Sequence, residues 1–394
     1  MAGQQYKVVS YFINVGVGDG AIHLLLENNH VSKAVLIDGG EVEAGACTAF
    51  TIAALHQKYQ GSFTGFDAIA ITHWDGDHFR GTLKMLYEDI VQNGQTSYIK
   101  QTTKIYAPAT SFNKVQAEGK FRRVKVPNVD HQYELQIKTP NHQDWQRLCE
   151  FVISTYCIGY DLFSGIPLSG HHGTPKLIDS LGDVYTASNL LQGGTPIFLC
   201  IGCEDFFIDW PDIEDTFNEN EINRLAETKK NMNASSLMLI SIWPKALPTD
   251  PPRINLYTAG DAEEEQEEPF IEWIKNPNAV IDVIKPGHHG SAKVTPERLL
   301  DYQTKIFLIS AGGRHGHPTL SLLFFLMSYI YYKFSDSKPH VFATCYPYWM
   351  NKPRALYNDV DVNLENFLSY KKGAYQIKAV VQKLTGINCV DVWF

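Results

Sequence analysis

The segment ITHWDGDHFRG, residues 71–81, crowds two imidazoles and two carboxylates onto one short turn: His73, Asp75, Asp77 and His78. It follows an apolar, strand-like run and leads into a helical pattern, so it is predicted to be a strand-to-helix loop. Buried without a partner, these four groups would repel one another or stay unsatisfied. They are also the ligand types that divalent metal ions use. The segment therefore predicts a metal site, with a solvated acidic helix start as the alternative.

The spacing within this loop divides the four ligand candidates into two pairs. His73 and Asp75 alternate out of an extended segment onto the same side. Asp77 and His78 lie at the turn into the helix and can point toward a second ion. The loop thus has the residues for contacts to two ions.

Three later stretches carry the same residue types after predicted strands. Asp261 stands in LYTAGDAEEE, His288 and His289 stand in VIKPGHHGS, and His315 and His317 stand in GRHGHPT. Functional groups of α/β proteins gather at the carboxyl ends of strands. Histidines and aspartates brought together from strand ends along the whole chain are what a two-metal hydrolase needs.

The distribution of patterns divides the chain into two regular parts and a less regular middle. Alternating apolar residues and glycine turns predict strands in KVVSYFINVG, AIHLLLE, KAVLIDGG and FDAIAIT, and helices over 43–60 and from 77 onward. Strand patterns return in SSLMLISI, INLYTAGD, AVIDVIKPG and KIFLISAG, followed by a helix over 319–334. The middle is predicted to contain helices, one of them over 178–192. We expect an α/β core formed by residues 1–100 and 231–394, the latter with a C-terminal extension, and an insertion or cap formed by residues 101–230.

Composition narrows the class of protein. The 394 residues carry a net charge of −9, which counts against a non-specific nucleic-acid binder without excluding a metal-dependent nuclease. No signal peptide is recognised at the N-terminus, and the most apolar run, 320–332, is shorter than the roughly 20 residues that span a bilayer. The seven scattered cysteines are expected to be reduced, and Cys200 and Cys203 to pack in a core strand. We therefore expect a cytoplasmic protein with no membrane partner.

Taken together, the order H-x-D-x-D-H, G-D and P-G-H-H-G-S resembles the metallo-β-lactamase superfamily, and more closely its ComEC-like branch, the hydrolase domain of the competence DNA-uptake protein. FINVGVGDGAIHLLL, VLIDGG, NASSLML and GHP resemble further motifs of that branch. The resemblance covers about residues 6–90 and 230–345. It implies an α/β fold of the metallo-β-lactamase type, an αββα sandwich, with a large insertion between its two halves.

Carried over residue by residue, the resemblance also implies a ligand set for two divalent metal ions. His73 and Asp75 would hold the first ion; Asp77, His78 and His288 would hold the second; Asp261 would bridge both. His288 is preferred because it continues the strand register. The further candidates are as follows: His289, Asn233, His171 and His172.

Two departures from the superfamily pattern bear on the metal. Asp75 stands where most members have histidine, and Asn233 stands near the place of another histidine. Both changes replace nitrogen by oxygen, which shifts the preference of the site from zinc toward manganese or magnesium. Mn²⁺ is therefore favoured, with Zn²⁺ or Mg²⁺ as alternatives.

The remaining polar residues of the motifs have predicted roles around the metals. Asp77 would orient the nucleophilic water, and His317 would contact a phosphate or protonate the leaving group. Three further residues are expected to lie next to the ligands and to hold them in place without binding the metals: Asp19, Asp38 and Ser291. Structural roles for His317, Asp19 and Ser291 are alternatives.

The resemblance favours a phosphodiester substrate, with DNA as the first choice. The basic stretch FRRVKV within the middle segment could track a nucleic-acid backbone, although a solvated strand edge would give the same pattern. A small-molecule ester, lactone or phosphodiester is the alternative substrate, and a regulatory or binding module with an inactive site is the alternative function. By analogy, a stand-alone nuclease could act in DNA processing or phage defence. The segment 101–230 is also a candidate surface for a protein partner or a homo-oligomer.

Overall fold

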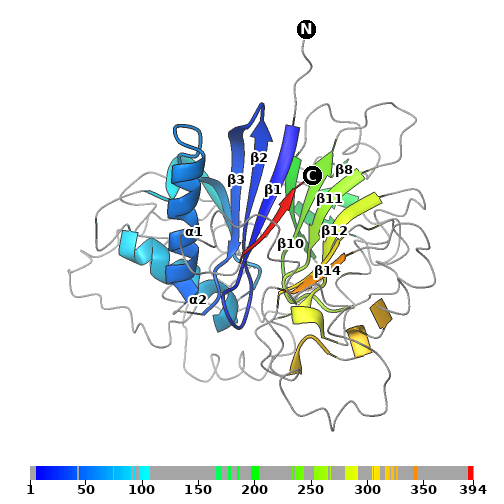
Figure 1. The fold of residues 1–394 in the computed structure, drawn as a ribbon. Coiled ribbons are helices and arrows are strands. Elements are labelled where there is room, and N and C mark those ends of the chain that lie inside the picture. Colours follow the sequence, from blue (N-terminus) through cyan, green and yellow to red (C-terminus); the bar gives the residue numbers. More distant parts are fainter. Residues whose placement is uncertain are drawn as a thin grey trace, which may run out of the picture.

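The computed structural model contains two β-sheets that face each other, with helices on the outer side of the first sheet (Figure 1). The structure describes residues 6–41, 44–73, 75–89, 93, 97–106, 166–169, 176–178, 184–185, 197–203, 233, 236–243, 253–264, 267, 280–291, 304, 306–310, 316–319, 321–323, 325–326, 340–343 and 389–393.

The first sheet has six strands in the order β15-β1-β2-β3-β4-β5. Their bounds are as follows: β1 Tyr6–Ile13, β2 Gly20–Glu27, β3 His30–Asp38, β4 Phe66–Ala70, β5 Ile99–Tyr106 and β15 Cys389–Trp393. β1, β2 and β3 form an antiparallel meander, whereas β4 and β5 run parallel to β3. β15 pairs antiparallel with β1, so residues near the end of the chain complete the sheet that its first residues begin. The predicted strands within residues 6–70 are confirmed.

Two helices cover the outer face of the first sheet. They are α1, Gly45–Lys58, and α2, Gly76–Tyr87, as the sequence predicted. Between the helices and the sheet lies a core of fully buried side chains that includes Tyr11, Leu36 and Leu83. Gly81 in α2 permits close approach to the loop after β3, because a Cβ there would lie 2.0 Å from the carbonyl oxygen of Gly39. This packing fixes where α2 begins, next to the carboxyl end of β4.

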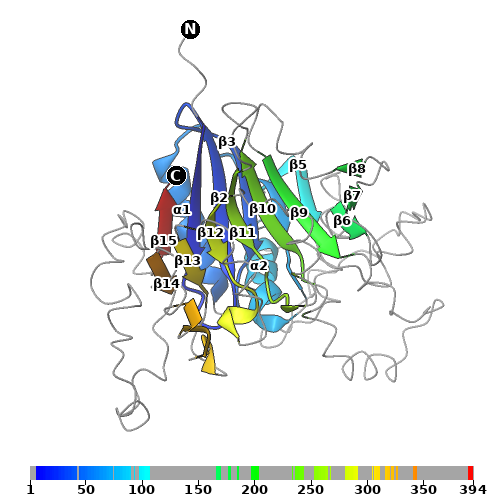
Figure 2. The same cartoon turned by 90° about the vertical axis from the view of Figure 1, so that its right-hand side faces the viewer.

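The second sheet has nine strands in the order β14-β13-β12-β11-β10-β9-β6-β7-β8 (Figure 2). Their bounds are as follows: β6 Ile166–Ser169, β7 Lys176–Ile178, β8 Val184–Tyr185, β9 Ile197–Cys203, β10 Met238–Trp243, β11 Arg253–Thr258, β12 Val280–Lys285, β13 Ile306–Ile309 and β14 His340–Ala343. From β11 to β14 the strands are parallel, so their carboxyl ends meet at one edge.

Apolar side chains of both sheets fill the space between them. The first sheet contributes Phe12, Ala21, Val35, Ile37 and Ala70, and the second contributes Leu237, Leu239, Leu256, Val283 and Leu308. This alternation of inward residues is what packs two sheets face to face.

The outer face of the second sheet is also covered. Tyr257 on that face is fully buried, and its hydroxyl donates to the Glu267 carboxylate at 2.8 Å. The helical residues 321–323 and 325–326 belong to the predicted helix 319–334 and carry buried leucines. The architecture is therefore the predicted α/β sandwich of two sheets between two outer layers, αββα.

Where the structure describes residues 166–203, the middle of the chain forms strands. β6, β7, β8 and β9 extend one edge of the second sheet, since β9 pairs antiparallel with β10 and parallel with β6. The helix predicted over 178–192 is wrong where the structure describes it, because β7 and β8 pair there as an antiparallel hairpin. FRRVKV lies outside the described residues. Within the described part of the chain, no helix is both long and apolar enough to cross a membrane.

His23 on β2 gives a prediction for acid stability. Its ring is fully buried between the sheets, faces Ser10 Oγ at 2.8 Å through Nδ1, and packs edge-on against Phe12. Burial lowers the pKa of His23 from 6.5 to about 3. Because only the unfolded chain takes up a proton between these values, the free energy of unfolding is expected to fall by about 1.4 kcal/mol per pH unit below about pH 6.5.

Urea denaturation at pH 7.5, 5.5 and 4.5 measures this effect against a His23→Gln control, which does not titrate. The wild type should lose stability relative to the control as the pH falls. Equal losses in the two proteins would contradict the account.

Candidate metal centre

Three strand ends, those of β4, β11 and β12, bring the candidate ligands to one edge of the sandwich. His73 follows β4, and His78 lies in the first turn of α2, which begins only six residues after β4 ends. Asp261 stands three residues beyond the end of β11, and His289 stands four beyond the end of β12. Next to the site, the amide of Leu237 donates a hydrogen bond to the Thr72 carbonyl at 2.8 Å, which joins the two halves of the fold.

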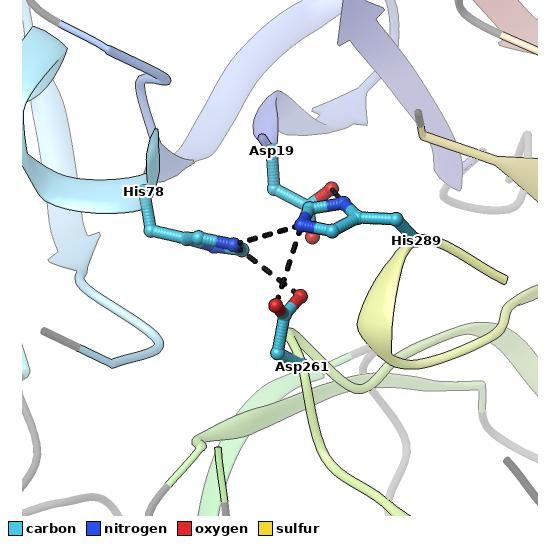
Figure 3. Close-up of side chains that lie close together, drawn as sticks. All are labelled: Asp19, His78, Asp261 and His289. Atoms are coloured by element: carbon cyan, nitrogen blue, oxygen red, sulfur yellow. Dashed lines mark hydrogen bonds and ion pairs between the residues drawn. The ribbon is translucent and has the colours of Figure 1, made fainter. Parts of the chain in front are cut away.

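The centre of the site is formed by His78, His289 and Asp261 (Figure 3). Nε2 of His78 lies 3.3 Å from Nε2 of His289. Each of these nitrogens also lies 3.3 Å from a different oxygen of the Asp261 carboxylate. With the Asp19 carboxylate, these side chains form a compact group of four ligand-type residues, all buried. Ligand-type atoms from four segments of the chain thus converge on one small volume.

The other three residues of the H-x-D-x-D-H segment surround this group. Nε2 of His73 lies 3.6 Å from Asp75 Oδ2 and 3.7 Å from Asp261 Oδ2. Asp77 Oδ2 lies 3.6 Å from His289 Nε2. Asp261 therefore faces all three histidines: its Oδ2 lies near both His73 and His289, and its Oδ1 lies near His78, whose ring is centred 4.0 Å from that of His73.

Hydrogen bonds at the Nδ1 atoms of the histidines orient their Nε2 atoms toward the compact group. Nδ1 of His78 donates to Asp38 Oδ2 at 2.8 Å, and Nδ1 of His289 donates to the Ser310 carbonyl at 2.9 Å. Thr72 Oγ1 donates to the same Asp38 oxygen and lies 3.2 Å from Nδ1 of His73. A histidine that donates through Nδ1 offers the lone pair of Nε2, which is how metal-binding histidines are oriented.

Several buried polar atoms of the group have no hydrogen-bond partner among the described residues. They are Oδ1 of Asp19, Nε2 of His73 and Oδ1 of Asp261. Buried polar atoms are nearly always satisfied, so three such atoms at one place need a further partner. A divalent cation accepts the lone pairs of carboxylate and imidazole together. The residues present therefore fit a divalent metal ion.

The charges in the site favour a cation as well. Burial would raise the pKa of Asp261, but the neighbouring histidines outweigh it and hold this pKa well below its usual range. Burial would lower the pKa of His289, but the carboxylates of Asp261 and Asp19 raise it to about 10. The carboxylates of Asp261 and Asp38 likewise raise the pKa of His78 above its usual value against the effect of burial. In the metal-free protein, protons on histidine supply positive charge to this site.

The loop between β1 and β2 enters the site from the first sheet. Gly18 has φ +96°, and a Cβ there would lie 1.7 Å from the carbonyl oxygen of Asp77. Only glycine fits such a conformation and such an approach. The adjacent amide of Asp19 donates to the same Asp77 oxygen at 3.3 Å. Asp19, predicted to support the ligands from behind, thus stands within the compact group itself.

The P-G-H-H-G turn places its two histidines differently from the ligand set that the resemblance implied, in which His288 was preferred. His288 and His289 have φ values of +44° and +53°, so neither continues the strand register of β12. His289 faces His78 and Asp261, whereas His288 lies 3.2 Å from Glu263 Oε1 through its Nδ1. The structure thus brings His289, the further candidate, into the position that the prediction gave to His288.

The remaining candidates lie around the more exposed side of the site or beyond the described residues. Asn233 Nδ2 is 3.4 Å from His288 Nδ1, and the ring of His317 is centred 5.2 Å from that of His288. Ser291 is buried at the end of the P-G-H-H-G-S turn, and its amide donates to the His288 carbonyl. The following lie outside the described residues: His171, His172 and His315.

One residue next to the site was missed in the sequence. Lys285, the last residue of β12, is buried and contacts Asp19. The signal was available, because Lys285 ends the largely apolar run VIDVIK, and a charged residue is unusual in a strand that is covered on both faces.

Comparison with known proteins adds little to this geometry. No family model matches the sequence, and no curated protein matches it significantly. Among solved structures, the chain is similar to the crystal structure of the short form of human tRNase Z. The two sequences are 12% identical, and the TM-score is 0.32. The match covers 85% of this chain and 91% of that chain. A likeness of this extent does not establish an activity. The assignment of the site therefore rests on its own geometry.

Proposed function

We propose that this protein is a metal-dependent hydrolase of phosphodiesters, and that its substrate is DNA. The observation that carries the hydrolase assignment is the convergence of His78, His289 and Asp261 from three loops, with His73 3.7 Å from the same Asp261 carboxylate. The motif resemblance to the ComEC-like branch of the metallo-β-lactamase superfamily supports the choice of DNA.

Two divalent ions would be held by residues around Asp261. His73, Asp75 and Asp261 would hold one ion, and Asp77, His78, His289 and Asp261 would hold the other. Bound divalent ions lower the pKa of water and stabilise charge that develops on a phosphate. The oxygen-rich first group, with Asp75 in place of histidine, favours Mn²⁺, and Zn²⁺ or Mg²⁺ remain alternatives.

The residues of the chain would divide the remaining tasks by position. Asp77, partly exposed and 3.6 Å from His289, would orient the attacking water. His317 would donate a hydrogen bond to the phosphate or a proton to the leaving oxygen from its place beside His288. The buried carboxylate of Asp38 would keep Nε2 of His78 directed at the metal.

Cleavage of supercoiled plasmid and single-stranded DNA tests the proposal. Wild-type protein and the Asp77→Ala variant are compared in EDTA and in Mn²⁺, Mg²⁺ or Zn²⁺. We expect cleavage only with metal, greatest with Mn²⁺, and loss of cleavage in the variant. Intact DNA in the presence of protein that demonstrably binds metal would contradict the choice of DNA. Hydrolysis of bis-p-nitrophenyl phosphate by that same protein would then identify a small-molecule phosphodiesterase.

A further inference from the structure

Lys285 is a buried lysine directly beside the metal centre. Its side chain is 4% exposed, and its ammonium contacts the Asp19 carboxylate. The same nitrogen lies 3.2 Å from the Gly260 carbonyl oxygen and 3.4 Å from that of Pro286. Three acceptors match the three N–H groups of an ammonium, which is the condition for burying this charge.

These contacts connect Lys285 to the segments that present the ligands. Asp19 belongs to the loop between β1 and β2, and its second oxygen lies 3.5 Å from Nδ1 of His289. Gly260 immediately precedes Asp261 and also accepts the amide of His288 at 3.1 Å. One ammonium thus links the first sheet, the loop of Asp261 and the strand that leads to His289.

Both side chains of this ion pair are buried. A cavity of about 10 Å³ adjoins it between the sheets, lined by Asp19, Lys285, Thr258 and Ser310 among others. That volume has room for about one water molecule. Burial alone would raise the pKa of Asp19, but Lys285 foremost, with His289 and His78, lowers it well below its usual range. Without Lys285, the carboxylate of Asp19 would be left beside that of Asp261 with much less positive charge nearby.

We propose that Lys285 is a positioning residue of the metal centre, which acts by holding Asp19 against His289 and the carbonyl that precedes Asp261. The inference rests on the metal site of the proposed function, but not on the identity of the substrate. In this role Asp19 acts on the ligands through its contacts, since one of its oxygens meets the ammonium and the other lies 3.5 Å from Nδ1 of His289.

Metal affinity measured by competition with a chelating dye tests this role without any assay of hydrolysis. The variants are Lys285→Met, Asp19→Asn and the double variant, titrated with Mn²⁺ and Zn²⁺. Residues that support metal ligands typically contribute about 10–100-fold to affinity, and we expect a loss in that range for each single variant. The double variant should lose no more than the single ones, because both residues act through one ion pair.

Co²⁺ serves as a spectroscopic probe of the ligand geometry. The visible absorption of bound Co²⁺ should change in the same way in all three variants. Lys100→Met is the matched control, since Lys100 also pairs with a carboxylate, Asp67 at 3.1 Å, away from the ligand group. It should keep the wild-type affinity and spectrum.

Three results would overturn the proposal. One is wild-type affinity and an unchanged Co²⁺ spectrum in Lys285→Met, even if that variant is less stable. Another is a loss in Asp19→Asn far larger than in Lys285→Met, with additive effects in the double variant, which would make Asp19 a ligand. The third is a wild type that binds no metal, which removes the centre altogether. If Lys285→Met does not fold, the double variant, which buries neither charge, decides the outcome. Failure to cleave DNA would overturn only the substrate.

Discussion

Replacing Asp261 with asparagine is expected to lower metal affinity by at least about 100-fold and to abolish hydrolysis. The substitution keeps the shape of the side chain but removes the negative charge that faces His73, His78 and His289. Loss of a residue that only supports a ligand already costs about 10–100-fold, and Asp261 is placed to contact both ions itself. Isothermal titration with Mn²⁺ and Zn²⁺ gives the affinity, and plasmid cleavage gives the activity.

Glu263→Gln is the matched control for this experiment. It makes the same change of carboxylate to amide two residues further along the same loop, where Glu263 faces His288 and not the compact group. The control should bind metal with an affinity close to that of the wild type. Equal losses in Asp261→Asn and Glu263→Gln would contradict the central place of Asp261 and would return His288 to the ligand set.

Metal binding is expected to release protons and to strengthen as the pH rises. The pKa of His289 is raised to about 10 and that of His78 lies above 6.5, because buried carboxylates face both rings. The raised pKa of His289 means that the pair, whose Nε2 atoms are 3.3 Å apart, is expected to carry an extra proton at neutral pH. A ligand histidine must be neutral, so this proton leaves when metal binds. Below the raised pKa, the apparent affinity should increase roughly tenfold per pH unit for each proton released.

Isothermal titration at pH 7 in buffers with different heats of ionisation counts the protons. A second series at pH 6, 7 and 8 gives the slope of affinity against pH. We expect at least one proton per centre and a steeper slope for Zn²⁺ and Mn²⁺ in the wild type than in His289→Gln. An affinity that does not change between pH 6 and 8 would show that the histidines are not the ligands.

Many strands and helices of the fold were predictable because they depend on the pattern of residues that are close in the sequence. The alternating runs around β1, β2 and β3 and the helical patterns of α1 and α2 agree with their final structure. The pairing of β15 with β1 could not be read from the sequence, since it joins residues nearly the whole chain apart. The error over 178–192 has a similar cause, because the strands β7 and β8 are short and their pairing depends on the sheet that β6 extends.

The candidate site was predictable in its residue types and less so in its geometry. Asp261 and the H-x-D-x-D-H residues were identified from the motif order, and the structure gathers them at one edge. The choice between His288 and His289 depended on extending the register of β12. The structure instead gives both residues positive φ values, which a side-chain pattern does not encode. Asp19 was expected behind the ligands, and its contact with Lys285 became visible only when the two sheets came together.

Anomalous diffraction from crystals grown with Mn²⁺ or Zn²⁺ tests the metal centre most directly. The account predicts a peak within about 2.0–2.3 Å of Nε2 of His78, Nε2 of His289 and an oxygen of Asp261. It predicts a second peak beside His73, Asp75 and Asp261. Well-diffracting crystals with metal bound elsewhere, and none at this group, would contradict the central claim that these strand ends form a divalent metal centre.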